Sequence, residues 1–346
     1  MASELRVGVI GVGMMGADHA ERLVTRTAGA RLVAVSDPDT ARAAELASRY
    51  DGVRSVGDPL ELIADDGVDA VVIASPGFVH EEQVLACIEH RTYALCEKPL
   101  TMDAESSLRI VEAEAAAGPP LVQVGFMRRF DPEYAAMKAM LDSGQLGRTL
   151  LLHNTHRNKA VPESFRSEMI VRDSLVHEVD VARFLFGEEI TEITVLAPAP
   201  TGVAAEGVLD PQVALFRMAG GGMATTEVFV NCQVGYEVRC EAVAERGTVV
   251  AGRNSTGLYS TVADDHGGYW GGQVPPDFRA RFARAYDLEV QAWVDASRRG
   301  EVVGPSTWDG YAATAVCTAG MESLATGQPV KVQLAERTAL LDGARR

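Results

Sequence analysis

The first 126 residues alternate short apolar runs with helix-forming segments, and this alternation limits the chain to few architectures. Five runs rich in β-branched or other apolar residues predict strands: Leu5–Ile10, Ala30–Asp37, Asp69–Pro76, Thr92–Glu97 and Leu121–Phe126. Helices are predicted between them at residues 18–27, 40–49, 80–90 and 104–117. Strands that are apolar on both faces have no solvated side, so they belong to a parallel sheet covered by helices. We therefore place an α/β domain at residues 1–125.

The pattern changes beyond residue 126. A predicted helix at Pro132–Ser143 is followed by closely spaced strand patterns at residues 149–157, 192–197, 212–218, 223–231 and 236–244. Such strands, with glycine-rich connections, indicate an antiparallel or mixed sheet. Helices are predicted again at residues 277–297 and 310–325. Residues 126–346 are therefore predicted to form a second, α+β domain on a largely antiparallel mixed sheet.

A glycine-rich turn follows the first predicted strand. The segment G-V-G-M-M-G contains Gly11, Gly13, Met14, Met15 and Gly16 and leads into a helix. In this context the glycines permit a tight turn, close approach to a pyrophosphate and close helix packing, and the helix N-terminus favours phosphate. The alternative is that the glycines only form a tight loop. Asp37, at the end of the second strand, supplies the acid that the dinucleotide fingerprint requires, so we predict a Rossmann domain.

The carboxylate of Asp37 bears on the choice of cofactor. It can accept hydrogen bonds from the adenosine ribose and would repel a 2′-phosphate. The next residues, Pro38 and Asp39, supply no cation. NAD is therefore predicted rather than NADP, and Asp37→Ser combined with Pro38→Arg is expected to shift the preference towards NADP.

The composition of the chain limits the cellular compartments and the classes of partner that can be expected. The formal net charge of −16 argues against nucleic acid and anionic membranes, since both attract basic surfaces. No apolar run is long enough to span a bilayer, and the N-terminus leads into a strand without a signal-peptide core. Five cysteines are scattered without a C-x-x-C pair, as is typical of reduced thiols. We expect a cytoplasmic protein with a small-molecule partner.

Polar residues follow two of the predicted parallel strands. Ser75, Pro76 and His80 lie at the end of one strand, and Glu97 and Lys98 lie at the end of another within C-E-K-P-L. Ligands of parallel α/β sheets bind beyond the carboxyl ends of the strands, so these residues are candidates for the cofactor site. Two alternatives stay open: His80 as a capping or packing residue, and Glu97 with Lys98 as an exposed loop pair.

A second polar constellation lies in V-R-D-S-L-V-H-E-V-D. If a helix begins at Ser174, then Asp173, His177 and Asp180 follow at i, i+4 and i+7 and share one face. An Asp that orients a His is the arrangement of a general base, because imidazole titrates near neutral pH. The alternative has Asp173 as a helix N-cap and His177 as a surface residue.

No metal site is predicted. His153 and His156 are three residues apart on a strand pattern. Their side chains therefore point to opposite faces of the sheet and cannot chelate one ion together.

Taken together, G-V-G-M-M-G, C-E-K-P-L and D-x-x-x-H-E-V-D resemble the glucose-fructose oxidoreductase / inositol dehydrogenase / rhizopine catabolism family. The stretches F-M-R-R-F-D-P-E-Y, G-Y-E-V-R-C-E and D-F-R-A-R-F-A-R-A-Y-D-L-E-V-Q-A-W are similar to its inositol branch, and the resemblance covers nearly the whole chain. It implies a Rossmann domain followed by an open-sheet domain, often assembled through that sheet into a homotetramer, with a homodimer as the alternative.

The resemblance also implies roles for individual residues. Lys98 would lie beside the nicotinamide and the substrate hydroxyl, and Asp173 with His177 would form the catalytic dyad. Further polyol contacts would come from Met127, Arg128, His156, Asp180 and Tyr236. One departure is S-E-M-I-V-R (residues 167–172), where many members carry a glycine-rich stretch, and this difference would reshape the pocket that selects the isomer.

The resulting hypothesis is NAD-dependent oxidation of a secondary alcohol of a cyclic polyol. The substrate would be myo-inositol, or scyllo- or chiro-inositol, and the product a keto-inositol. Three alternatives stay open: an NAD-dependent dehydrogenase of an aldose or sugar derivative, a glycosidase that uses NAD internally, and a dinucleotide-sensing regulator without catalysis. The presence of Lys98, Asp173 and His177 together argues against the regulator.

Overall fold

The computed structural model describes residues 4–252, 260–261, 269–270 and 275–337, which form two compact units. The first unit holds the chain up to Met127, Tyr286–Thr314 and the described residues from Ala335 on; the second holds Arg128–Ala285 and Ala315–Leu334. The chain first passes from one unit to the other after Met127, two residues beyond the expected boundary at 125. Residues 286–314, expected in the second domain, fold with the first unit.

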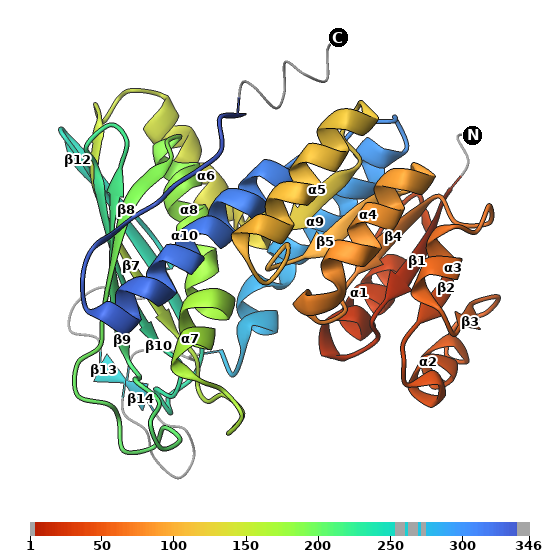
Figure 1. The fold of residues 1–346 in the computed structure, drawn as a ribbon, viewed down its shortest axis with the longest axis horizontal. Helices are drawn as coiled ribbons and strands as arrows, with labels where there is room; N and C mark the ends of the chain where they lie inside the picture. Colours follow the sequence, from red (N-terminus) through yellow and green to blue (C-terminus); the bar gives the residue numbers. More distant parts are fainter. Residues whose placement is uncertain (1–3, 253–259, 262–268, 271–274, 338–346) are drawn as a thin grey trace. The chain divides into compact units, whose positions relative to one another are not determined.

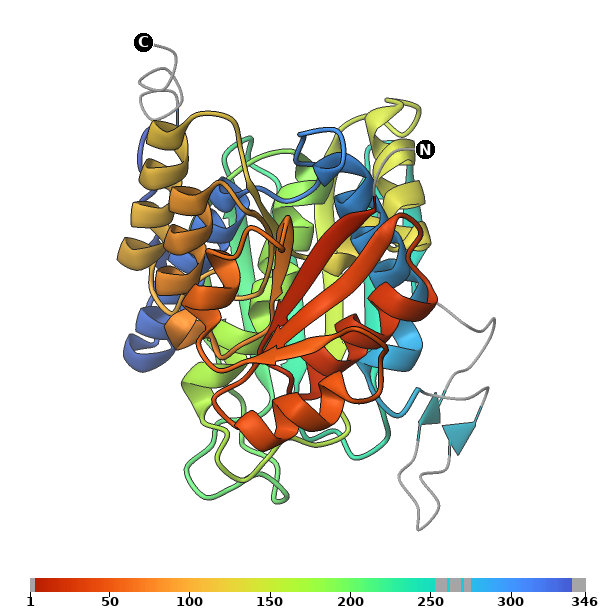
Figure 2. The ribbon, with the colours of Figure 1, turned by 90° about the vertical axis from the view of Figure 1, so that its right-hand side faces the viewer.

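The first unit is built on a six-stranded sheet. Its strands are β1 (Leu5–Ile10), β2 (Ala30–Ser36), β3 (Arg54–Val56), β4 (Ala70–Ile73), β5 (Tyr93–Glu97) and β6 (Val122–Gly125). Their order is β3-β2-β1-β4-β5-β6, and every neighbouring pair is parallel. Figure 2 shows strands of this sheet running side by side. The predicted parallel Rossmann sheet is confirmed, and the short strand β3 is an addition.

Helices connect the strands of the first unit: α1 (Met14–Thr25), α2 (Thr40–Ala47), α3 (Pro59–Ile63), α4 (His80–His90) and α5 (Ala104–Ala117). Three of them, α2, α3 and α5, are capped by the side chains of Asp39, Asp58 and Asp103, each of which accepts a hydrogen bond from a backbone N–H of the first turn. Helix α1 has Gly13 in its N-cap position and therefore no side-chain cap. Its first N–H groups therefore keep their capacity to bind an anion.

The core of the first unit explains why part of the C-terminal region returns to it. Helix α9 (Phe278–Ser297) contributes Val290, Trp293 and Val294, which are fully buried in one cluster with strand residues such as Val9 and Val72. Burying a large apolar side chain stabilises a fold by about 1.5–3 kcal/mol. The C-terminal half of α9 is therefore an integral part of the first unit.

The second unit is built on a seven-stranded sheet. It contains β7 (Thr149–Arg157), β8 (Ile190–Leu196), β9 (Gln212–Met218), β10 (Met223–Phe229), β11 (Glu237–Ala244), β12 (Gly247–Ala251) and β15 (Val330–Lys331). The order is β12-β11-β7-β10-β9-β8-β15. β7 and β10 are parallel, and the other neighbours are antiparallel. The predicted mixed, largely antiparallel sheet is confirmed.

Helices of the second unit lie on one face of this sheet. Figure 1 shows α6 (Pro132–Asp142) and α8 (Val176–Phe186) on the same side of the strands. Along β10 and β11, buried residues alternate with half-buried ones, as expected of strands with one packed and one open face. Helix α10 (Thr307–Thr326) also contributes residues from 315 on to this unit. No helix in the described part of the chain has the length and apolar composition needed to cross a bilayer.

Candidate active site

The three glycines after β1 are Gly11, Gly13 and Gly16, and the structure gives different reasons for a glycine at each position. Gly11 has φ +80°, and a Cβ there would lie 2.6 Å from the Ser75 backbone. A Cβ on Gly16 would lie 1.7 Å from the carbonyl oxygen of Gly11. At Gly13 a Cβ would meet no atom of the described residues within 4 Å. The protein's own packing therefore requires Gly11 and Gly16, whereas Gly13 fits the close approach of another molecule, as a bound pyrophosphate would demand.

Asp37 lies beside this turn and is held by three donors. Its Oδ2 accepts the N–H of Val12 at 2.8 Å, and its Oδ1 accepts the N–H of Asp39 at 2.9 Å and Nη2 of Arg42 at 2.8 Å. Burial acts to raise the pKa of Asp37, but these hydrogen bonds outweigh it, so the pKa is lowered and the group is ionised at neutral pH. The side chains of the two methionines in the turn differ in exposure: Met14 is exposed and Met15 half-buried.

His80 links two strand ends. The first residue of α4 is buried, with Nε2 2.8 Å from the carbonyl oxygen of Ser75 and Nδ1 2.9 Å from that of Pro99. Burial lowers the pKa of His80 despite both contacts, so the neutral ring donates to one carbonyl at a time. Pro76 is exposed, and the hydroxyl of Ser75 donates to Gln83 at 2.6 Å. His80 is thus a packing residue that ties the loop after β5 to the end of β4, and a direct cofactor contact stays a prediction.

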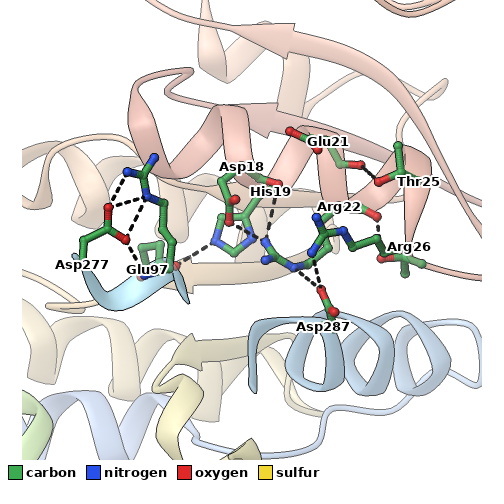
Figure 3. A network of polar contacts seen from close by, with 11 residues as sticks. Asp18, His19, Glu21, Arg22, Thr25, Arg26, Glu97, Asp277 and Asp287 are labelled. Carbon is green, nitrogen blue, oxygen red and sulfur yellow. Dashed lines mark hydrogen bonds and ion pairs between the residues drawn. The ribbon is translucent and has the colours of Figure 1, made fainter. Parts of the chain in front are cut away.

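Glu97 and Lys98 end β5 at the same edge of the sheet. Glu97 is buried, and its Oε1 lies 2.8 Å from Nε2 of His19 on α1; Figure 3 shows the two side chains pointing toward one another. Burial acts to raise the pKa of Glu97, but His19 and Lys98 outweigh it and lower the pKa. The alternative of an exposed loop residue is therefore wrong for Glu97. Lys98 is half-buried directly after it.

A buried ionic cluster occupies the second unit. Glu178 accepts a hydrogen bond from Nη1 of Arg128 through Oε1, and its Oε2 lies 3.0 Å from Nδ1 of His156. The side chains of all three are at most 4% exposed. The rings of Tyr236 and His177 lie 5.7 and 6.1 Å from that of His156. Four predicted substrate residues therefore come together around Glu178, in a setting rich in hydrogen-bonding groups.

This cluster fixes charges and one tautomer. Burial acts to lower the pKa of Arg128, but the charge of Glu178 outweighs it and raises the pKa. Burial likewise acts to raise the pKa of Glu178, and Arg128 with His156 lowers it. Because the ionised carboxylate only accepts, its contact with His156 assigns the donor hydrogen to Nδ1 and leaves Nε2 for a further hydrogen bond. Such a nitrogen is suited to a hydroxyl group.

The segment with the predicted dyad is irregular. Asp173 lies in a π-helical turn, Ile170–Leu175, and accepts Nε and Nη2 of Arg172 at 2.8 Å each. Helix α8 then begins after Leu175 and carries His177, which is 7% exposed. Asp173 as N-cap and His177 as a surface residue are therefore both wrong. Turns of π-helix occur frequently at functional sites.

Asp180 and Met127 are both buried. Asp180 is 1% exposed and accepts Nη2 of Arg129 at 2.6 Å and Nε at 3.0 Å. Met127 is 1% exposed and opens the 3-10 turn Met127–Phe130. Their contact with a substrate stays a prediction. So does the meeting of Lys98, in the first unit, with Asp173 and His177, in the second.

Sequence patterns did not single out five residues that hold site residues in place: His19, Arg42, Arg129, Arg172 and Glu178. Glu178 carried a signal, since it lies inside H-E-V-D. Successive helical residues point about 100° apart, however, so a face chosen through His177 and Asp180 leaves Glu178 out. The expectation that His153 and His156 face opposite ways is confirmed, since His153 is exposed and His156 buried on β7.

Family models match both units of the chain. The model "Oxidoreductase family, NAD-binding Rossmann fold" matches residues 5–126, and "GFO/IDH/MocA C-terminal domain" matches residues 134–250. The chain belongs to the GFO/IDH/MocA family. Its first unit is accordingly an NAD-binding Rossmann domain, in agreement with the glycine turn and Asp37.

Relatives within the GFO/IDH/MocA family match over nearly the whole length. Inositol 2-dehydrogenase of Mycolicibacterium smegmatis is 54% identical, over 98% of this chain and 99% of that protein. Inositol 2-dehydrogenase of Streptomyces avermitilis is 49% identical, over 97% of each. Myo-inositol dehydrogenase of Lactobacillus casei, solved in complex with NAD(H) and myo-inositol, has a TM-score of 0.90 and 33% identity, covering 98% of this chain and 99% of that one.

Proposed function

We propose that the protein is an inositol 2-dehydrogenase that oxidises a secondary alcohol of myo-inositol, or of scyllo- or chiro-inositol, to the keto-inositol with NAD. The observation that carries this proposal is the sequence identity of 49–54% to proteins named inositol 2-dehydrogenase, over nearly the whole length of the chain. The solved relative that holds NAD(H) and myo-inositol supports the same substrate class. The buried cluster of His156, His177, Tyr236 and Arg128 supplies the donors and acceptors that a polyol needs.

NAD would be held at the carboxyl edge of the first unit's sheet. The turn from Gly11 to Gly16, with Met14 and Met15, would receive the pyrophosphate, and Asp37 the adenosine ribose. Ser75, Pro76, His80, Glu97 and Lys98 lie at or after the ends of β4 and β5 and would border the nicotinamide half. When bound, NAD accepts the hydride that leaves the alcohol carbon.

The chain's own residues would handle the proton. A ring nitrogen of His177 would accept the hydroxyl proton, with Asp173 holding the imidazole in one tautomer. The amine of Lys98 would donate a hydrogen bond to the same oxygen and stabilise its negative charge. Met127, Arg128, His156, Asp180 and Tyr236 would surround the remaining polyol hydroxyls. Specificity would then depend on the hydroxyl contacts that differ between isomers.

The experiment is a screen of myo-, scyllo- and chiro-inositol, aldoses and sugar acids, followed by NADH absorbance with NAD and NADP in parallel. We expect His177→Ala and Lys98→Ala to lower inositol-dependent turnover by at least about 10²-fold with NAD binding retained. His153→Ala, on the opposite face of β7 from the cluster, is the matched control and should keep normal turnover. Turnover of aldoses alone would favour the sugar dehydrogenase, and no NADH with any polyol would contradict the proposal.

We also propose a cytoplasmic homotetramer, or homodimer, assembled through the open face of the second unit's sheet. The five cysteines are all free thiols, as favoured in a reducing compartment. The open face carries apolar side chains such as Val213, Leu215 and Leu196 on neighbouring strands. Apolar residues on an uncovered sheet face are typical of an interface.

A further inference from the structure

We propose that Arg42 is a cofactor-specificity residue: it weakens the discrimination of Asp37 against NADP and can bind a 2′-phosphate once that carboxylate is removed. Positions 38 and 39 supply no cation, but Arg42, in the first turn of α2, places Nη2 2.8 Å from Oδ1 of Asp37. The inference depends on NAD binding by the first unit. The proposed inositol activity is needed only for a second measurement, the kinetics with NAD and NADP.

The hydrogen bonds of Asp37 limit what a ribose can receive. A carboxylate offers about four acceptor positions. Asp39 N–H and Arg42 Nη2 occupy two on Oδ1, and Val12 N–H occupies one on Oδ2. One position on Oδ2 is left, so a second ribose hydroxyl can bond to Asp37 only if Arg42 moves. Arg42 can do so because its side chain is 49% exposed, whereas that of Asp37 is 4% exposed and held by two backbone donors.

The local charges explain why Arg42 affects discrimination. An ionised Asp37 alone would repel a 2′-phosphate, but the guanidinium beside it offsets that charge. Asp39 also faces the guanidinium, with Oδ2 3.9 Å from Nε, so NAD remains the preferred cofactor. A guanidinium matches phosphate geometry through paired N–H bonds. The wild-type protein should therefore bind NADP more tightly than a variant with Asp37 but no Arg42.

Removal of the carboxylate leaves a group of donors aimed at one place. In Asp37→Ser the N–H groups of Val12 and Asp39 and the guanidinium of Arg42 lose their shared acceptor. Two backbone donors and an arginine around one position are the elements of a phosphate site. The single substitution should therefore favour NADP without the added arginine at position 38, and it should do so only while Arg42 is present.

The experiment measures the dissociation constants of NAD and NADP by titration calorimetry for five proteins: wild type, Arg42→Ala, Asp37→Ser, Asp37→Ser with Arg42→Ala, and Arg49→Ala. Arg49 follows α2 and pairs with Glu45, so its loss removes the same charge without touching Asp37. We expect Arg42→Ala to raise the NADP/NAD ratio of dissociation constants about tenfold, as for one charged hydrogen bond. Asp37→Ser should lower the ratio at least about tenfold, and the double variant should lose most of that gain.

Two outcomes would overturn the inference: Arg42→Ala matching Arg49→Ala, or Asp37→Ser giving the same ratio with and without Arg42. Circular dichroism of each variant confirms folding, and if Asp37→Ser does not fold, the comparison of Arg42→Ala with Arg49→Ala decides alone. Inositol-dependent kinetics with both cofactors should follow the same order. Failure of every polyol with intact NAD binding would contradict the proposed substrate and leave the binding ratios as the test of Arg42.

Discussion

Glu178 joins two side chains from distant segments, Arg128 in the turn after β6 and His156 on β7. A buried carboxylate and guanidinium are stable only together, because each buried charge is costly without its partner. The cluster also presents His156 in one tautomer. Glu178 is thus a positioning residue for a predicted substrate contact.

Removing one charge from this cluster should be severe. Glu178→Ala leaves Arg128 buried without its counter-ion, and we expect the free energy of unfolding to fall by about 3–5 kcal/mol. Urea unfolding followed by circular dichroism measures the loss. The matched control is Glu192→Ala, whose pair with Arg217 is partly exposed and should contribute less than about 1 kcal/mol. Equal losses in the two variants would contradict the assignment of an ionised pair at Glu178.

The same residue predicts a pH dependence. The pKa of Glu178 is lowered in the folded protein from its ordinary value of 4.5. A carboxyl with a depressed folded pKa contributes stability that is fully present above the unfolded value and is lost as pH falls through the folded one. The gap in unfolding free energy between wild type and Glu178→Gln should therefore be constant from pH 7 to about 5 and should narrow below 4.5. Chemical denaturation across that range checks it, and a gap that widens in acid would contradict the shift.

In helix α1 and the turn before it, two glycine-to-alanine substitutions should have different effects, one on protein stability and the other on NAD binding. Gly16→Ala would force a Cβ into the Gly11 carbonyl oxygen, and we expect a loss of about 1–3 kcal/mol from overpacking. Gly13 has φ −67° and open space around it, so Gly13→Ala should keep the thermal midpoint and weaken NAD binding about tenfold or more. Thermal unfolding and NAD titration of both variants test the pair. A Gly13→Ala protein with unchanged NAD affinity would argue against pyrophosphate at this turn.

The helices show where sequence patterns are sufficient to predict the bounds of an element. Helices α4 and α5 have the predicted bounds, and α5 lies between Asp103 and Gly118, two residues that favour helix ends. Helix α1 begins at Met14 rather than at residue 18, since the glycine turn leads directly into it. The π-helical turn at Ile170–Leu175 has no residue signature. It lies where a regular helix was expected to begin at Ser174, so that part of the prediction was wrong, and the shared face of Asp173 and His177 stays a prediction.

On the scale of the whole molecule, the class of each domain was predictable and the path of the chain between the units was not. Apolar strands and the glycine turn report local structure, which sequence carries directly. The return of residues 286–314 depends on Trp293 and its neighbours packing against strands more than 190 residues earlier in the chain. Nothing in the helical pattern of residues 277–297 distinguishes the half that packs in one unit from the half that packs in the other.

Assembly is the property of the whole molecule that the open sheet face predicts. Val213 and Leu215 are half-buried on β9, beside Leu196, which is 47% exposed on β8. Glutamates at Val213 and Leu215 would put two charges on the face proposed as the interface, where an unpaired buried charge costs several kcal/mol. We therefore expect Val213→Glu with Leu215→Glu to convert the proposed assembly to monomers that keep NAD binding.

Sedimentation velocity at micromolar concentration measures the mass of each species. Val24→Glu is the control, because Val24 is an exposed apolar residue of the first unit, 47% accessible on α1, and its replacement should leave the assembly unchanged. A wild-type protein that sediments as a monomer would contradict the proposed homotetramer or homodimer. An assembly that survives the glutamate pair would instead place the interface elsewhere, since the two charges cannot be buried between sheets without losing most of the association energy.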